Sequence, residues 1–351
     1  MTILVGAALL LVLGAGIAAI ALTRGGTKTP PSAPASSPSA SMVSEAVGSG
    51  AAVRIDPSTN KVSARLALSG SAAVGEGFAW IATRREIRKI DPRSNRIVFT
   101  IPLQVDDIAV GEGYVWATVT ESRGLGVVTD SLYRIDPATN HPQKLRSLPP
   151  RIATPFGLYP GQIAVGGGSV WITDAGPNSA AFVLEFDAKS GALVDRIGLP
   201  EPPAGIAFGE GAVWVRSNGL TPFLTKLDPG SGKVTGRLPL GGIDAVAAGN
   251  GNVWVADLTD NEVVKVDPSS TSQAGLVSGT LDGPEWIAVD RDGVWVVNRH
   301  DCSVARIDPG TNRVVATIPL HVVQPLVIAA SEEEGVWVAD TSGGHTQTGC
   351  G

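Results

Sequence analysis

Gly335-Val336-Trp337-Val338-Ala339-Asp340, near the C-terminus, is the stretch that decides the fold. It is the last of seven strands of the type Gly-x-Val-Trp-Val, and each strand carries one tryptophan at the same place. These tryptophans are Trp80, Trp116, Trp171, Trp214, Trp254, Trp295 and Trp337. A repeat of about 40 residues with four strand signals per unit is typical of a β-propeller blade. We interpret one indole per blade as packing between blades.

Each repeat has the same parts. A short apolar strand such as Ile108-Ala109-Val110 comes first, and a glycine-rich turn such as Gly111-Glu112-Gly113 follows. Glycine supplies the positive φ that two-residue hairpin turns need. After the Trp strand comes a third strand that ends in Ile-Asp-Pro, with Asn or Gly a few residues later. The aspartate can accept a backbone N–H within its turn, so we interpret the seven acidic residues as turn residues rather than calcium ligands.

The last Trp strand has no second half after it, and the missing half lies at Ala51–Leu68, before the first Trp strand. The two halves together make a seventh blade. The sequence therefore predicts an all-β, seven-bladed β-propeller over residues 51–341, closed by its N- and C-terminal half-blades. Closure removes two open sheet edges that would otherwise invite aggregation, and we expect a monomeric propeller.

The first fifty residues differ from the rest. Residues 1–26 contain the uncharged, apolar run Ile3–Leu22, which matches the ~20 residues of a transmembrane helix. A cleaved signal peptide is the alternative. Residues 27–50 form a Pro/Ser-rich linker that cannot bury enough surface to fold. Arg24 and Lys28 would favour a cytoplasmic C-terminal side, whereas a long domain behind a Pro/Ser spacer favours a propeller on the extracytoplasmic side of the cell membrane.

The net charge and the motifs present in the sequence exclude some classes of function. The net charge is −6, which argues against nucleic acid as a partner, because phosphate binding needs a basic face. The sequence holds no phosphate-binding loop, no His-Glu-x-x-His pair and no nucleophile elbow. We therefore assign no catalytic residue and expect no resident cofactor, with a divalent cation such as Ca²⁺ or Mg²⁺ as the alternative.

The candidate binding face carries the loops between the fourth and first strands and between the second and third strands. Two of its loops, residues 118–131 and 148–162, are long, and long loops on a rigid scaffold often carry function. The candidate ligand residues at the channel mouth are Asp106, Asp107, Gln162, Arg216, Asp244, Glu285, Trp286 and Arg299. An aromatic ring beside converging carboxylates suits a cationic or hydroxylated small molecule. The alternative is a solvated acidic rim with Trp286 plugging the axis.

The two cysteines, Cys302 and Cys350, fall on the same face in adjacent blades. A disulfide that pins the C-terminal tail, residues 342–351, suits an exported protein. A zinc site that uses these cysteines with His300, His321 or His345 is the alternative.

Copies such as Val294-Trp295-Val296-Val297-Asn298 and Arg306-Ile307-Asp308-Pro309-Gly310-Thr311-Asn312 resemble those of YVTN-repeat, or YncE-like, propellers. The order of anchor, spacer and propeller is similar to that of actinobacterial sensor proteins whose cytoplasmic part is a kinase or a regulator. The resemblance implies a non-catalytic sensor or scaffold that binds a small molecule, a cell-wall component or a protein. The alternative is a lyase or lactonase, similar to virginiamycin B lyase, with a divalent metal at the channel mouth.

Overall fold

The computed structural model describes residues 50–124, 127–149, 151–152, 161–175, 181–217, 221–322 and 325–340. The expected anchor (1–26), the linker except Gly50, and the tail (342–351) lie outside these residues. Among the residues that are described, no helix is long and apolar enough to cross a membrane. Their regular secondary structure consists of strands alone.

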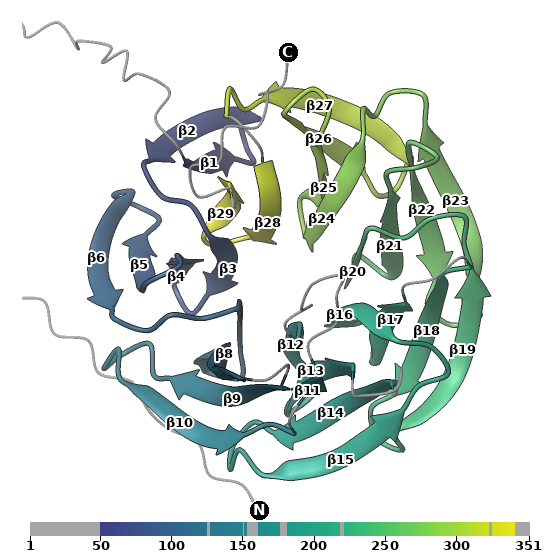
Figure 1. Cartoon of the computed structure of the whole chain (residues 1–351). Coiled ribbons are helices and arrows are strands. Elements are labelled where there is room, and N and C mark those ends of the chain that lie inside the picture. Colours follow the sequence, from purple (N-terminus) through teal and green to yellow (C-terminus); the bar gives the residue numbers. More distant parts are fainter. Residues whose placement is uncertain are drawn as a thin grey trace, which may run out of the picture. The chain divides into compact units, whose positions relative to one another are not determined.

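The strands form seven antiparallel sheets arranged around one axis (Figure 1). Blade 1 consists of β3 (Ser71–Gly75), β4 (Phe78–Ala82), β5 (Ile87–Asp91) and β6 (Arg96–Ile101). Blade 2 consists of β7 (Asp107–Gly111), β8 (Tyr114–Gly124), β9 (Val127–Ile135) and β10 (Pro142–Ser147), with the short β11 (Arg151–Ile152) paired to β9. Blade 3 consists of β12 (Ile163–Gly166), β13 (Ser169–Ala175), β14 (Ala181–Asp187) and β15 (Leu193–Gly198).

The remaining blades repeat this order from the axis outward. Blade 4 consists of β16 (Pro203–Gly209), β17 (Ala212–Ser217), β18 (Phe223–Asp228) and β19 (Lys233–Pro239). Blade 5 consists of β20 (Ala245–Gly249), β21 (Asn252–Asp257), β22 (Glu262–Asp267) and β23 (Ser272–Ser278). Blade 6 consists of β24 (Pro284–Asp290), β25 (Gly293–Asn298), β26 (Ser303–Asp308) and β27 (Arg313–Pro319). Blade 7 consists of β28 (Pro325–Ser331), β29 (Gly335–Asp340), β1 (Ala52–Asp56) and β2 (Lys61–Leu66).

Blade 7 closes the ring from both ends of the propeller, as the repeat count predicts. Strand β1 pairs antiparallel with β29, and the register joins Ala52 to Ala339 and Ile55 to Val336. The outer strand β2 then pairs with β1, and the inner strand β28 pairs with β29. The seven-bladed propeller fold and its closure by two half-blades are thus confirmed.

The turns explain the repeated glycines and aspartates. In the turn of blade 1, both Glu76 (φ 56°) and Gly77 (φ 79°) are left-handed, which is the geometry of the primed two-residue hairpin turn. In the outer turns the aspartate accepts backbone N–H groups, as Asp308 Oδ1 does from Thr311 at 2.7 Å. Asn312 closes that turn with φ 56°. These hydrogen bonds favour the ionised form and lower the pKa of six turn aspartates: Asp56, Asp91, Asp187, Asp228, Asp267 and Asp308.

The core lies between the blades. All seven repeat tryptophans are 0 % exposed, and they are packed among the apolar side chains of neighbouring strands. Strands β13 and β25 bury nearly every residue, because both of their faces are covered by neighbouring blades.

A cation also links most pairs of neighbouring blades. In blade 5, Lys265 Nζ lies 5.2 Å from the Trp254 ring and donates a 2.7 Å hydrogen bond to the carbonyl of Pro309 in blade 6. The same position of the third strand holds a cation with the same two contacts in four other blades: Lys89, Arg134, Lys226 and Arg306. We call these five side chains the inter-blade cations.

Blade 3 departs from this pattern. Its third strand carries Glu185 in place of the cation, and this buried carboxylate accepts a hydrogen bond from Ser169 of its own blade at 2.7 Å. Phe208 of blade 4 packs so closely on Gly166 that a Cβ there would lie 2.2 Å from the ring. At the seam between blades 3 and 4, Phe208 thus packs where a valine packs at other seams, as Val110 does against Gly75.

Candidate functional site

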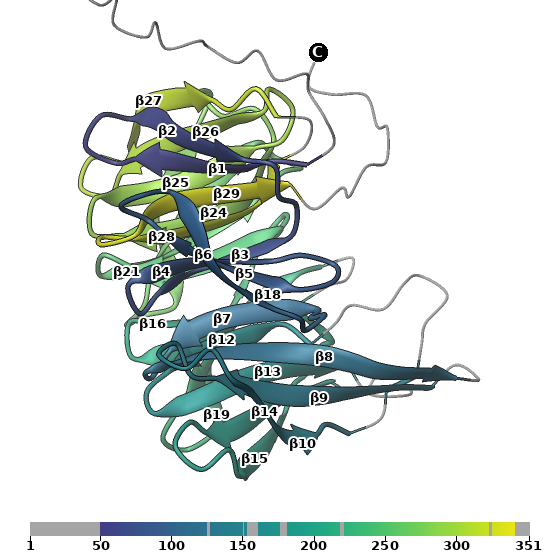
Figure 2. The ribbon, with the colours of Figure 1, turned by 90° about the vertical axis from the view of Figure 1, so that its left-hand side faces the viewer.

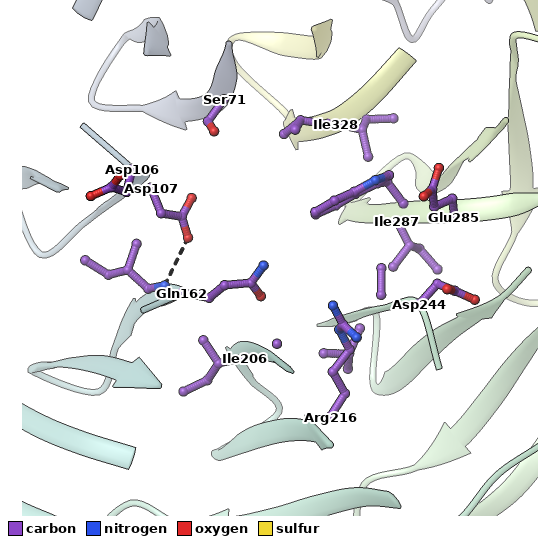
Figure 3. A pocket seen from close by; sticks show the side chains of 16 residues that line it. Ser71, Asp106, Asp107, Gln162, Ile206, Arg216, Asp244, Glu285, Ile287 and Ile328 are labelled. Carbon is purple, nitrogen blue, oxygen red and sulfur yellow. Dashed lines mark hydrogen bonds between the residues drawn. The ribbon is translucent and has the colours of Figure 1, made fainter. Parts of the chain in front are cut away.

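The candidate site is a cavity of about 420 Å³ on the propeller axis, lined by residues from all seven blades (Figure 3). Its volume falls within the ~300–1,000 Å³ usual for small-molecule sites. Seven of the eight ligand residues expected from the sequence line this cavity: Asp106, Asp107, Gln162, Arg216, Asp244, Glu285 and Trp286. The eighth, Arg299, is not among the lining residues and forms an ion pair with Glu285, which is. The structure thus brings these residues together, and their role in binding stays a prediction.

Asp107 is the carboxylate that faces the cavity. It begins β7, and Figure 3 shows its side chain pointing inward beside Gln162. One carboxylate oxygen accepts the N–H of Ile108 at 2.9 Å, and the other accepts the N–H of Ile163 in blade 3 at 3.1 Å. Burial raises the pKa of Asp107 to about 6, although these two hydrogen bonds oppose the rise. Asp107 is therefore ionised near neutral pH but poorly hydrated.

We expected the carboxylates of Asp106 and Asp244 to converge at the channel mouth, but both bond to backbone groups instead. Asp106 Oδ2 accepts the N–H of Thr120 at 2.5 Å, and Asp244 Oδ2 accepts the N–H of Leu258 at 2.7 Å. Asp106 thus bonds to the Trp strand β8 and Asp244 to the residue after the Trp strand β21, and Figure 3 shows both carboxylates turned away from the centre of the cavity. The four carboxylates of the mouth therefore do not converge, because Asp106 and Asp244 turn away from the cavity toward backbone N–H groups of their own blades.

Arg216 reaches the axis because its neighbour has no side chain. Arg216 is the penultimate residue of β17 and lies next to Gly205 of the inner strand β16 in the sheet register. A Cβ at Gly205 would lie 2.4 Å from Arg216 Nε. The glycine leaves the space through which the guanidinium passes inward, and Arg216 Nη1 donates to the carbonyl of Ile243 at 3.3 Å.

Glu285 and Trp286 form the wall of the cavity in blade 6. Glu285 Oε1 accepts a 3.0 Å hydrogen bond from Arg299, and its side chain is 18 % exposed. Burial raises the pKa of Glu285; Arg299 opposes this rise and the charge of Asp244 adds to it. Trp286 is half-buried and packs against the cluster of buried side chains that includes Trp295 and Ile328. Its ring thus extends the apolar part of the cavity wall.

A second acidic cluster escaped the sequence analysis. Asp257, Asp260 and Glu262 lie at the turn between β21 and β22, and their carboxylate oxygens all lie within 4.8 Å of one another. Burial, followed by the charges of Asp257 and Asp260, raises the pKa of Glu262. Three acids within six residues directly after a Trp strand are the signal that could have revealed this cluster. It lies in one blade, away from the lining of the axial cavity.

The long loop expected at residues 118–131 is largely a strand pair. Strands β8 and β9 continue their pairing to Gly124 and Val127, and β11 pairs with β9 at its far end. Figure 2 shows β8 and β9 extending well past the other strands. The β-branched runs Thr118–Thr120 and Val127–Thr129, with Gly124-Leu125-Gly126 between them, are the sequence signal for this hairpin. Residues 153–160 of the second long loop lie outside the described residues.

Cys302 lies at the same face, is 3 % exposed and is disulfide-bonded. Cys350 lies outside the described residues, so the Cys302–Cys350 pairing stays a prediction. His345 also lies outside them. His300 contacts Asp282 at 3.2 Å, and the described residues do not bring it together with Cys302 and His321 as a group of metal ligands.

Comparison with known proteins identifies the fold alone. A chain in a structure titled "Crystal Structure of Mitotic Checkpoint Complex" superimposes with a TM-score of 0.60, covering 94% of this chain and 97% of that chain at 11% sequence identity. As many as 979 chains of known structure show a significant match, so this likeness does not single out a function. No family model and no curated protein matches the sequence.

Proposed function

We propose that this protein is a membrane-tethered propeller on the extracytoplasmic side of the cell, where it binds a ligand on its loop face as a sensor or scaffold without catalysing a reaction. The observation that carries the binding role is the axial cavity, since all seven blades contribute residues to one partly charged space. A rigid scaffold that presents polar groups around an apolar-walled pocket is the usual form of a small-molecule site. The propeller fold itself is common among proteins that bind other proteins.

The arrangement of the carboxylates favours binding over metal-assisted chemistry. Asp106 and Asp244 are committed to backbone N–H groups, and Glu285 is committed to Arg299. Ca²⁺ and Mg²⁺ need several oxygen ligands around one point. The carboxylates that do approach one another, Asp257, Asp260 and Glu262, lie outside the lining of the cavity.

Thermal unfolding of the purified full chain tests the binding role. We expect at least one member of a panel of small cations, carboxylates, sugars and cell-wall fragments to raise the melting temperature, because a ligand that binds only the folded state stabilises it. Trp286→Ala should abolish that shift, and Glu76→Gln, on the opposite face, should retain it. A large shift with Ca²⁺ or Mg²⁺ that EDTA reverses would favour the metal-dependent enzyme instead.

The membrane tether rests on the apolar run Ile3–Leu22 and the Pro/Ser-rich segment that follows it. We expect the full chain to sediment with membranes and to resist extraction by alkaline carbonate. Protease added to intact cells should remove the propeller while a cytoplasmic marker protein stays whole. Recovery of the chain in the soluble fraction, or protection of the propeller until the cells are lysed, would contradict the tether or its orientation.

A further inference from the structure

Asp107 is a half-buried carboxylate that faces the axial cavity, and no ion pair with it is seen among the described residues. Its two oxygens accept only the backbone N–H groups of Ile108 and Ile163. The other charge that acts on it is that of Asp106, which has the same sign. Among the described residues no cation lies within ion-pair distance of Asp107. A desolvated carboxylate of this kind gains most from a ligand that brings a positive charge.

The rest of the cavity is shaped for an organic ligand. Gln162 and Ser71 lie beside Asp107 and offer an amide oxygen and a hydroxyl group as further hydrogen-bond acceptors. Trp286, Ile287 and Ile328 form an apolar part of the wall away from Asp107. An indole face also attracts a cation directly.

On the premise that the axial cavity is the binding site, we propose that it takes a small organic ammonium ion with an apolar body. The ammonium group donates hydrogen bonds to Asp107 and Gln162, and the apolar body packs against Trp286 and Ile328. A bare metal ion fits less well, because it needs several oxygen ligands around one point and Asp107 is the one carboxylate turned into the cavity.

The other charged groups around the cavity agree with this placement. Arg216 is on the far side of the cavity from Asp107 (Figure 3), so it repels the ammonium group toward Asp107. The further acids of the wall are Asp106 of blade 2, Asp244 of blade 5 and Glu285 of blade 6, and Glu285 is neutralised by Arg299. The lining therefore holds four carboxylates and one guanidinium, an excess of negative charge.

The test is isothermal titration calorimetry of the full chain with three ligands of one shape: n-pentylammonium, 1-pentanol and pentanoate. At pH 7.5 we expect pentylammonium to bind about tenfold or more tightly than pentanol, because only the cation gains a charge-assisted hydrogen bond. Pentanoate should bind most weakly. Asp107→Asn should reduce the affinity for pentylammonium to that for pentanol, and Glu76→Gln, which removes a distant charge, should leave it unchanged.

The pH dependence gives a second readout that needs no variant. An alkylammonium ion stays protonated below about pH 10, as lysine does, whereas Asp107 gains a proton as the pH falls through about 6. The affinity for pentylammonium should therefore fall between pH 7.5 and 5, and that for pentanol should change little.

Equal affinity for pentylammonium and pentanol, tighter binding of pentanoate, or competition by Ca²⁺ at low concentration would overturn the proposal. These outcomes are separable from failure of the binding role itself. If another ligand raised the melting temperature and Trp286→Ala abolished the effect, the cavity would remain a binding site, and only its preference for ammonium ions would be wrong.

Discussion

Replacing Lys265 with methionine tests whether the inter-blade cations stabilise the ring. Methionine retains the length of the apolar stem and removes the charged end. The variant loses the 2.7 Å hydrogen bond to the Pro309 carbonyl and the contact 5.2 Å from the Trp254 ring. A hydrogen bond from a charged donor contributes about 1.5–3 kcal/mol, and a cation–π contact contributes about 0.5–2 kcal/mol. Since removing the lysine also relieves its partial desolvation, we expect a net loss of about 2–3 kcal/mol.

Equilibrium urea unfolding of the full chain, followed by tryptophan fluorescence, measures this loss. In a separate thermal scan, the melting temperature of the variant should fall by about 4–10 °C, given the usual change per kcal/mol for domains of this size. Lys233→Met is the matched control, because Lys233 is exposed on the outer strand β19. If Lys265→Met unfolds within about 0.5 kcal/mol of the wild type, the inter-blade cations do not stabilise the seams and our account of them is wrong.

Four further predictions concern other residues. Gly166→Ala should destabilise the seam between blades 3 and 4 by more than about 2 kcal/mol in urea unfolding, because its Cβ would lie 2.2 Å from the Phe208 ring. Asp107, with a folded pKa of about 6 against about 3.9 when unfolded, should make stability fall as the pH rises from about 4 to 6, and Asp107→Asn should reduce that fall in unfolding curves at pH 4.5 and 7.5. The turn aspartates have lowered pKa values, so the protein should lose stability as the pH falls below about 4 and these carboxylates gain protons. In an acid titration, the Asp308→Asn variant should lose less stability than the wild type. Mass spectrometry without reductant should recover a Cys302–Cys350 peptide pair, and two free thiols would refute the disulfide.

The fold was predictable because each repeat contains the same residue types at the same positions, for the same physical reasons. The period of the tryptophans, the positive φ demanded at Gly77 and Asn312, and the half-blade at Ala51–Leu68 all follow from local chemistry and counting. The inter-blade cations carried an equally regular signal, since a lysine or an arginine precedes the apolar residue before Asp-Pro in most repeats. The sequence did not lead us to predict a contact between blades at these positions, because a cation in a strand is ordinarily interpreted as solvent-exposed.

The sequence predicted which residues line the candidate site, but it did not predict which way their side chains point. Alignment of the repeats placed Asp106, Asp107 and Asp244 at the channel mouth, because equivalent positions of the blades meet at the axis. The direction of each carboxylate depends on which backbone N–H lies within reach. Asp106 and Asp107 are adjacent, yet one turns to Thr120 of its own blade and the other to Ile163 of the next. Sequence alone does not determine that choice.

The cavity and the closure of the ring depend on each other. Asp107 receives one of its two hydrogen bonds from blade 3, and an apolar part of the wall away from it comes from blades 6 and 7. Blade 7 in turn exists only when β1 pairs with β29. No single blade contains a binding site, so any ligand of the cavity must stabilise the closed ring over the open chain. A ligand of the cavity should therefore restore part of the melting temperature that a variant of a distant seam loses, although that variant touches no residue of the cavity.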